Sequence, residues 1–250
     1  MKLRLRLIAI SFLFLISLNA NATPAAGVSG TLSIIPGLGQ VANGNPLEGL
    51  GWFTSSVGLF FSGDAIAQQI GFDLWMYNMY DAYRDAKPAG GKTTNFNVFQ
   101  NYIAAFNPLN VVDPIGGPIV GIGAMAGARS KYPCLHYGIC PPVYGFVGMA
   151  EEGFFRGFLF PGFSDLFNST IAGAIISSSI FAVAHVSGGR SNLAIGPMTS
   201  RFVGGMLFSW QAHRNKYDLR KNIFAHAWFD IFVTDGGKIE GGQLKVPIHF

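Results

Sequence analysis

Six ionisable residues lie in otherwise apolar stretches of the sequence and could take part in chemistry. They are Glu151, Glu152, Arg156, His185, His226 and Asp230. Ionisable groups are costly inside membrane-type segments, so they usually mark a function there. Carboxylates and imidazoles together can move protons during hydrolysis, bind a metal ion or carry a cation.

The first group contains two adjacent carboxylates. On a helix, Glu151 and Glu152 point about 100° apart, and Arg156 follows Glu152 by four residues on nearly the same face. We therefore expect Glu152 and Arg156 to pair, which leaves Glu151 free to face elsewhere. A carboxylate of this kind is a candidate general base toward water. The simpler alternative is a plain Glu-Arg pair at a membrane surface.

The two histidines lie in separate apolar segments. His185 ends a segment that has no other ionisable side chain, where it could instead cap a helix. His226 and Asp230 are four residues apart and therefore share one helix face. They could orient each other, bind a metal ion or hold a substrate oxygen, and a satisfied His-Asp pair within a bundle remains the simpler interpretation.

The composition indicates a membrane protein. Of the 250 residues, 12% are charged and 50% are hydrophobic, whereas roughly 25% of a typical soluble domain is charged. So few charges would not cover a water-exposed surface. The formal net charge is only +4 and the basic residues form short clusters, so nucleic acid is not expected as a partner.

Six apolar segments of helical size predict an all-α, polytopic transmembrane bundle with about six spans. They are residues 47–61, 108–128, 143–163, 170–186, 193–212 and 222–233. Gly117, Gly121, Gly123 and Gly127 in the second segment are typical of a small-residue ridge along which helices approach closely.

Three parts are predicted along the chain. Residues 1–22 have basic residues before an apolar run and a small-x-small site, which is typical of a bacterial secretory signal peptide or of an uncleaved signal anchor. Residues 23–107 are expected to form a membrane hairpin and a polar interval, and residues 108–250 the core. Cys134 and Cys140 allow either a disulfide-closed loop or free thiols. The expected location is the bacterial inner membrane, with several passes.

Together, the three groups resemble the CAAX protease and bacteriocin-processing family (CPBP, Abi). The resemblance rests on Glu-Glu-x-x-x-Arg at 151–156, Phe-x-x-x-His at 181–185 and His-x-x-x-Asp at 226–230, and it covers roughly residues 143–233. It implies an all-helical intramembrane glutamic endopeptidase that needs no cofactor. The implied partners are a peptide or membrane-protein substrate and the lipid bilayer.

The resemblance also implies a role for each residue. Glu151 would be the catalytic carboxylate that activates water, and His185 would share that water. Glu152 and Arg156 would support the helix and orient Glu151. His226 would donate to the oxyanion of the tetrahedral intermediate.

Asp230 departs from the family's commoner Asn at the last motif position. An ionised Asp cannot donate to an oxyanion. We therefore expect Asp230 to orient His226 or to remain protonated.

Two alternatives use the same residues. Glu151, His185 and His226 could ligate zinc in a zinc-dependent intramembrane protease, although the chain contains no His-Glu-x-x-His motif. A non-catalytic membrane carrier or immunity protein is the alternative from another class. Arg201, near the middle of its apolar segment, could hold a substrate carboxylate or extend its charge to the membrane surface.

Overall fold

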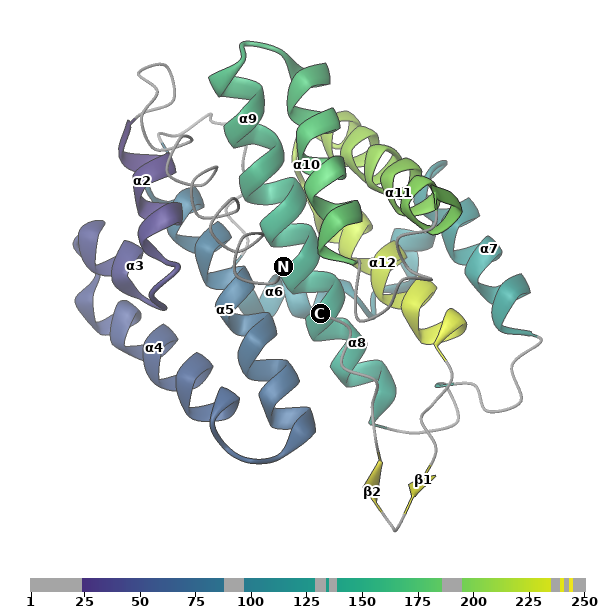
Figure 1. Ribbon diagram of the computed structural model, residues 1–250, viewed down its shortest axis with the longest axis horizontal. Helices are drawn as coiled ribbons and strands as arrows, with labels where there is room; N and C mark the ends of the chain where they lie inside the picture. Colours follow the sequence, from purple (N-terminus) through teal and green to yellow (C-terminus); the bar gives the residue numbers. More distant parts are fainter. Residues whose placement is uncertain are drawn as a thin grey trace.

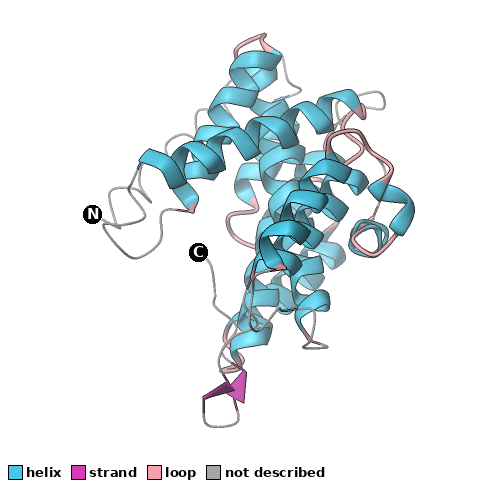
Figure 2. Cartoon of the chain, turned by 90° about the vertical axis from the view of Figure 1, so that its right-hand side faces the viewer, coloured by secondary structure: helices cyan, strands magenta, loops and turns pink. Residues whose placement is uncertain are grey.

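The computed structural model describes residues 24–87, 97–128, 134, 139–185, 195–234, 239–240 and 243–244. This part of the chain is helical except for two short antiparallel strands, β1 (Ile239–Glu240) and β2 (Gln243–Leu244) (Figure 2). Apart from that hairpin, the predicted all-α fold is confirmed for these residues. The predicted signal segment, residues 1–22, lies outside them.

The helical segments succeed one another with short connections. They are α2 (Pro24–Leu32), α3 (Leu38–Ala42), α4 (Pro46–Phe60), α5 (Ala65–Asp85), α6 (Val98–Ala104), the 3-10 helix η1 (Pro108–Val111), α7 (Gly116–Gly127), α8 (Cys140–Glu151), the π-helix η3 (Glu152–Leu159), α9 (Phe160–Leu166), α10 (Thr170–Ala184), α11 (Ile195–Arg214) and α12 (Arg220–Val233).

Each of the six predicted apolar segments contains helix. Residues 47–61 correspond to α4 and residues 170–186 to α10, whereas residues 143–163 cover α8, η3 and the start of α9 in one continuous run. No helix among the described residues combines the length and the apolarity needed to cross a membrane. The six spans, and the division of the chain at residue 107, stay predictions.

Helix α5 lies at the centre of a row of helices. It packs against α2 and α4 on one side and against α8 and η3 on the other, and α8 packs in turn against α12, which packs against α7. Figure 1 shows the row from the purple α4, through the blue α5 and the green α8, to the yellow α12 and the teal α7. The amino-terminal part of the chain therefore forms one wall of the helices that carry the candidate residues.

Two glycines allow η3 to approach α5 closely. A Cβ atom at Gly157 would lie 2.4 and 2.5 Å from two ring carbons of Tyr80, and one at Gly153 would lie 3.0 Å from the Tyr77 ring. Both tyrosines are fully buried and contact each other edge to face, with ring centroids 5.4 Å apart. The tyrosine pair of α5 thus occupies the space that the two glycines leave open.

A second glycine contact joins α7 to α12. A Cβ atom at Gly123 would lie 3.1 Å from Phe229 Cα, and one at Gly127 would lie 2.0 Å from the Phe232 carbonyl oxygen. The predicted small-residue ridge is therefore confirmed at these two positions. Gly121 faces open space instead, so it is not part of the contact.

Cys134 and Cys140 are buried free thiols. They pack in a small apolar cluster with Tyr144 and Ile231, and the backbone N–H of Cys134 donates to the carbonyl of Thr234 at 3.2 Å. Of the two expectations for this pair, the structure has the free thiols, placed beside the end of α12.

We predict that Gly157→Ala destabilises the protein, whereas Gly121→Ala does not. The added methyl group at residue 157 would overlap the buried Tyr80 ring, and overpacking of this kind costs roughly 1–3 kcal/mol. At residue 121 the methyl group meets nothing within 4 Å, and alanine favours a helix over glycine by roughly 0.5–1 kcal/mol. Thermal unfolding of the two purified variants, followed by circular dichroism, checks this difference. Equal stabilities would mean that α5 and η3 do not pack this tightly.

Candidate active site

The backbone changes from α- to π-helical directly after Glu151. The N–H of Phe160 donates to the carbonyl of Phe155, five residues earlier, and the Ser177 hydroxyl of α10 donates to the same carbonyl at 2.8 Å. π-Helical turns are rare and occur frequently at functional sites. The spacing argument from the sequence assumed a regular α-helix here, which is wrong because the wider turn begins at Glu152.

Glu152 is the centre of a buried hydrogen-bond network. Its Oε1 accepts from Arg156 Nη1 at 3.0 Å and from His226 Nδ1 at 2.6 Å, and its Oε2 accepts from Asn222 Nδ2 at 3.2 Å. Buried carboxylates are tolerated only when they are paired and hydrogen-bonded. The expected Glu152–Arg156 pair is present, and it joins η3 to α12.

Arg156 lies among aromatic rings from two further helices. Its Cζ is 4.4 Å from the ring centroid of Phe181 on α10 and 5.2 Å from that of Phe208 on α11, and its Nη2 donates to the Gly205 carbonyl at 3.5 Å. Guanidinium groups are attracted to the faces of aromatic rings at such distances. One arginine therefore contacts both α10 and α11.

Glu151 and His185 face each other. Glu151 Oε2 lies 3.4 Å from His185 Nε2 and 3.5 Å from His226 Nε2, and it has no hydrogen-bond partner among the described residues. The other nitrogen of His185, Nδ1, lies 2.8 Å from the carbonyl oxygen of Phe181. A carbonyl only accepts, so Nδ1 carries a proton and Nε2 is the nitrogen available to Glu151.

His226 lies between the two carboxylates at the ends of the cluster. Its Nδ1 donates to Glu152, while its Nε2 lies 3.5 Å from both Glu151 Oε2 and Asp230 Oδ2. The ring stacks on Phe208 with centroids 5.2 Å apart and planes at 16°. An imidazole nitrogen between two carboxylate oxygens needs at least one proton shared among the three atoms, because their lone pairs repel. Asp230 is thus placed to orient His226.

Solvent exposure differs among these side chains. Glu152 is 0% exposed, whereas Glu151 is 13%, Asp230 22% and His185 25% exposed. The structure therefore brings all six sequence-predicted residues into one cluster, with a closed end at Glu152 and an open end at Glu151 and His185. A ligand can reach only the open end.

Two members of the cluster were missed from the sequence. Asn222 lies four residues before His226, so Asn-x-x-x-His-x-x-x-Asp at 222–230 places three polar groups on one face of α12. That spacing was a usable signal. Phe208 gave none, because a phenylalanine in an apolar helix has no spacing that distinguishes it.

A third carboxyl group, Asp73, approaches the cluster from α5. It is 1% exposed, its Oδ1 accepts from Gln69 Nε2 at 2.8 Å, and its Oδ2 has no partner among the described residues. Burial raises the pKa of Asp73 well above its usual range, the Gln69 hydrogen bond opposes this, and the charge of Glu151 adds to it. The amino-terminal part of the chain therefore influences the charge of the site.

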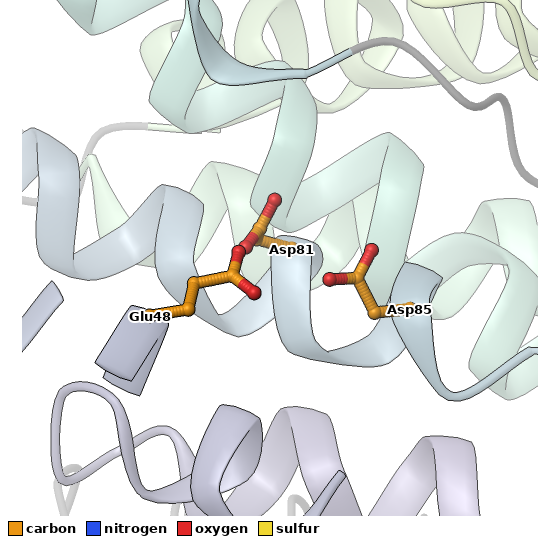
Figure 3. Close-up of side chains that lie close together, drawn as sticks. All are labelled: Glu48, Asp81 and Asp85. Carbon is orange, nitrogen blue, oxygen red and sulfur yellow. The ribbon is translucent and has the colours of Figure 1, made fainter. Parts of the chain in front are cut away.

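The candidate zinc ligands were tested by their geometry. A shared ion requires ligand atoms that all lie close to one another. Within the described ranges, Glu151, His185 and His226 do not form such a group, and the set that does is Glu48, Asp81 and Asp85, with ligand atoms within 4.8 Å (Figure 3). The residue types of the first set suit zinc, but their arrangement in this structure does not.

The acidic set on α4 and α5 already has a cation beside it. Arg84 Nη2 lies 2.5 Å from Asp81 Oδ1 and 2.8 Å from Asp85 Oδ1. Burial raises the pKa of Asp81 to about 7, although the charge of Arg84 opposes this. We therefore explain this cluster as an arginine-centred ion pair and assign no metal ion to it.

Comparison with known proteins places the cluster in a family. Residues 137–232 match the family model described as type II CAAX prenyl endopeptidase Rce1-like. No curated protein and no solved structure matches the chain. The matched range contains every residue of the three motifs, from Glu151 to Asp230, and the family resemblance drawn from those motifs is confirmed. Residues 137–232 belong to the Rce1-like family of type II CAAX prenyl endopeptidases.

Proposed function

We propose that this chain is an intramembrane endopeptidase that hydrolyses a peptide bond with water activated by Glu151 and His185. The observation that carries the proposal is the pairing of Glu151 Oε2 with His185 Nε2 at 3.4 Å, at the open end of the cluster. Membership of residues 137–232 in a family of peptide hydrolases supports the reaction class.

The geometry suits proton transfer from water. A water molecule that contacts both Glu151 and His185 would give one proton to the Glu151 carboxylate while its oxygen attacks the carbonyl carbon of the peptide. The C–N bond then breaks as Glu151 returns that proton to the leaving amine. Because water is the nucleophile, the reaction forms no covalent enzyme intermediate.

His226 is the candidate for charge stabilisation. Nδ1 is held by Glu152, which fixes the ring and directs Nε2 toward Glu151 and Asp230. A protonated Nε2 can donate to the oxyanion that develops on the peptide oxygen. Asp230 would hold the ring in that orientation rather than act on the oxyanion itself.

We further propose that the protein lies in the bacterial inner membrane. Large apolar side chains are exposed on several helices, including Ile122 and Met125 on α7, Ile171 on α10 and Trp210 on α11, with exposed fractions between 56% and 71%. Exposed apolar side chains on this scale suit a lipid or protein environment better than water. The substrate is then a peptide or membrane protein that reaches the cluster from the bilayer.

The first test is cleavage of a peptide library by the purified protein in lipid nanodiscs. We expect cleavage by the wild type, and a decrease in rate of roughly 100-fold or more in Glu151→Gln and in His185→Ala, because each removes a proton-transfer group. Glu48→Gln and His213→Ala, which alter exposed residues, serve as matched controls and should cleave as the wild type does. Full activity in Glu151→Gln would disprove the proposed mechanism.

Metal dependence is tested in the same assay with a chelator. We expect the wild type to remain active, because the reacting groups in our mechanism are Glu151 and His185 alone. Loss of activity that added zinc restores would instead establish the zinc-dependent alternative. If neither the wild type nor any variant cleaves a peptide, the non-catalytic carrier or immunity alternative is favoured.

The supporting role of Glu152 predicts that Asn222→Asp destabilises the protein. The change replaces a donor 3.2 Å from Glu152 Oε2 with a second carboxylate, so two buried negative charges would face each other. Asn45→Asp is the matched control, since Asn45 is the exposed N-cap of α4, where Asp is equally suitable. We expect a lower melting temperature for Asn222→Asp alone. Equal melting temperatures would show that Glu152 does not depend on its buried partners.

A further inference from the structure

Arg201 on α11 carries a buried donor without an acceptor. Its Nη1 atom is shielded from solvent and has no hydrogen-bond partner among the described residues. A guanidinium cannot avoid this cost by losing its proton, because it stays charged in proteins. The buried Arg156, in contrast, is paired with Glu152. An unfilled donor on a permanent cation indicates a place for an anionic ligand.

The position of Arg201 on α11 relates it to the active-site cluster. Arg201, Gly205 and Phe208 follow one another at intervals of four and three residues, so they lie on one helix face. Two of them contact the cluster directly, since the Gly205 carbonyl accepts from Arg156 at 3.5 Å and the Phe208 ring stacks on His226. Arg201 therefore continues the face that lines the site, one helical turn beyond Gly205.

The backbone around Gly205 supports this placement. A Cβ atom at Gly205 would lie 2.9 Å from Ser178 Cβ, so α11 is packed tightly against α10 at this level and its face is fixed. One helical turn is about 5.4 Å, and an extended peptide advances roughly 3.3 Å per residue. A substrate group bound by Arg201 would thus lie only a few residues from the bond that is cleaved.

We propose that Arg201 anchors the substrate by binding one of its carboxylates, either the terminal carboxylate or an acidic side chain a few residues from the cleaved bond. This inference rests on the proposed function, because it assumes that a peptide occupies the cluster. A guanidinium binds a carboxylate with two parallel hydrogen bonds, so the contact would fix both the position and the direction of the peptide.

The experiment uses a pooled library of ten-residue peptides made in two forms, one with free carboxyl termini and one with amidated termini. The full-length protein is measured in phosphatidylcholine nanodiscs as wild type, Arg201→Gln, Arg201→Lys and Arg214→Gln. Arg214 is an exposed residue of the same helix and is the matched control. For a cleaved peptide, KM and kcat are measured with the acidic group present and with it converted to the amide.

We expect Arg201→Gln to raise KM for the peptide with the carboxylate roughly 10-fold or more. The kcat value should change little, the amide form should be unaffected, and Arg201→Lys should recover part of the loss. Comparison of the terminal amide with an internal Asp→Asn or Glu→Gln peptide shows which carboxylate is bound. An equal loss for the carboxylate and amide forms would mean a structural role for Arg201, and no loss for either form would also overturn the proposal.

Binding keeps the proposal testable if no peptide is cleaved. Capture of the free-carboxyl pool by the wild type but not by Arg201→Gln would retain the anchor and contradict the hydrolytic function. Equal capture by the two proteins would overturn the anchor. The remaining source of an anion is lipid. If Arg201→Gln weakens only the association with vesicles containing phosphatidylglycerol, relative to phosphatidylcholine alone, Arg201 binds a headgroup and the proposal is wrong.

Discussion

The buried carboxylate of Glu152 is the interaction on which the rest of the site depends. It accepts hydrogen bonds from Arg156, His226 and Asn222, and a buried charge with fewer partners would be strongly destabilising. Arg156 in turn contacts Phe181 and the backbone of α11. One carboxylate therefore fixes the relative positions of η3, α10, α11 and α12, and it does so without meeting solvent itself.

Part of this arrangement could be predicted from the sequence because it depends on spacing within one helix. The apolar segments predicted the helices, the interval of four residues predicted the Glu152–Arg156 pair, and the same interval placed His226 and Asp230 on one face. The order of the three motifs predicted the family. The resemblance indicated that Glu151, His185 and His226 act together, but spacing within single helices could not place them in one cluster.

The rest depends on contacts between helices, to which a single sequence gives no direct access. The π-helical turn at Glu152 requires the Ser177 hydroxyl from α10 and the tyrosines of α5 around Gly153 and Gly157. Helix α5 itself was predicted only as a polar interval, because its tyrosines and carboxyl groups reduce its apparent hydrophobicity. In the structure those polar groups are buried, and Asp73 among them approaches Glu151 closely enough to affect its own ionisation.

The central claim is that two adjacent carboxylates have separate roles, since Glu152 holds the helices together while Glu151 faces the ligand. The most direct test is the thermal unfolding of Glu151→Gln and Glu152→Gln, which are identical chemical changes at neighbouring positions. We predict a clearly lower melting temperature for Glu152→Gln, because Arg156 would remain buried without its partner charge, and a melting temperature close to that of the wild type for Glu151→Gln. Equal destabilisation of the two variants, or a larger effect in Glu151→Gln, would contradict the account.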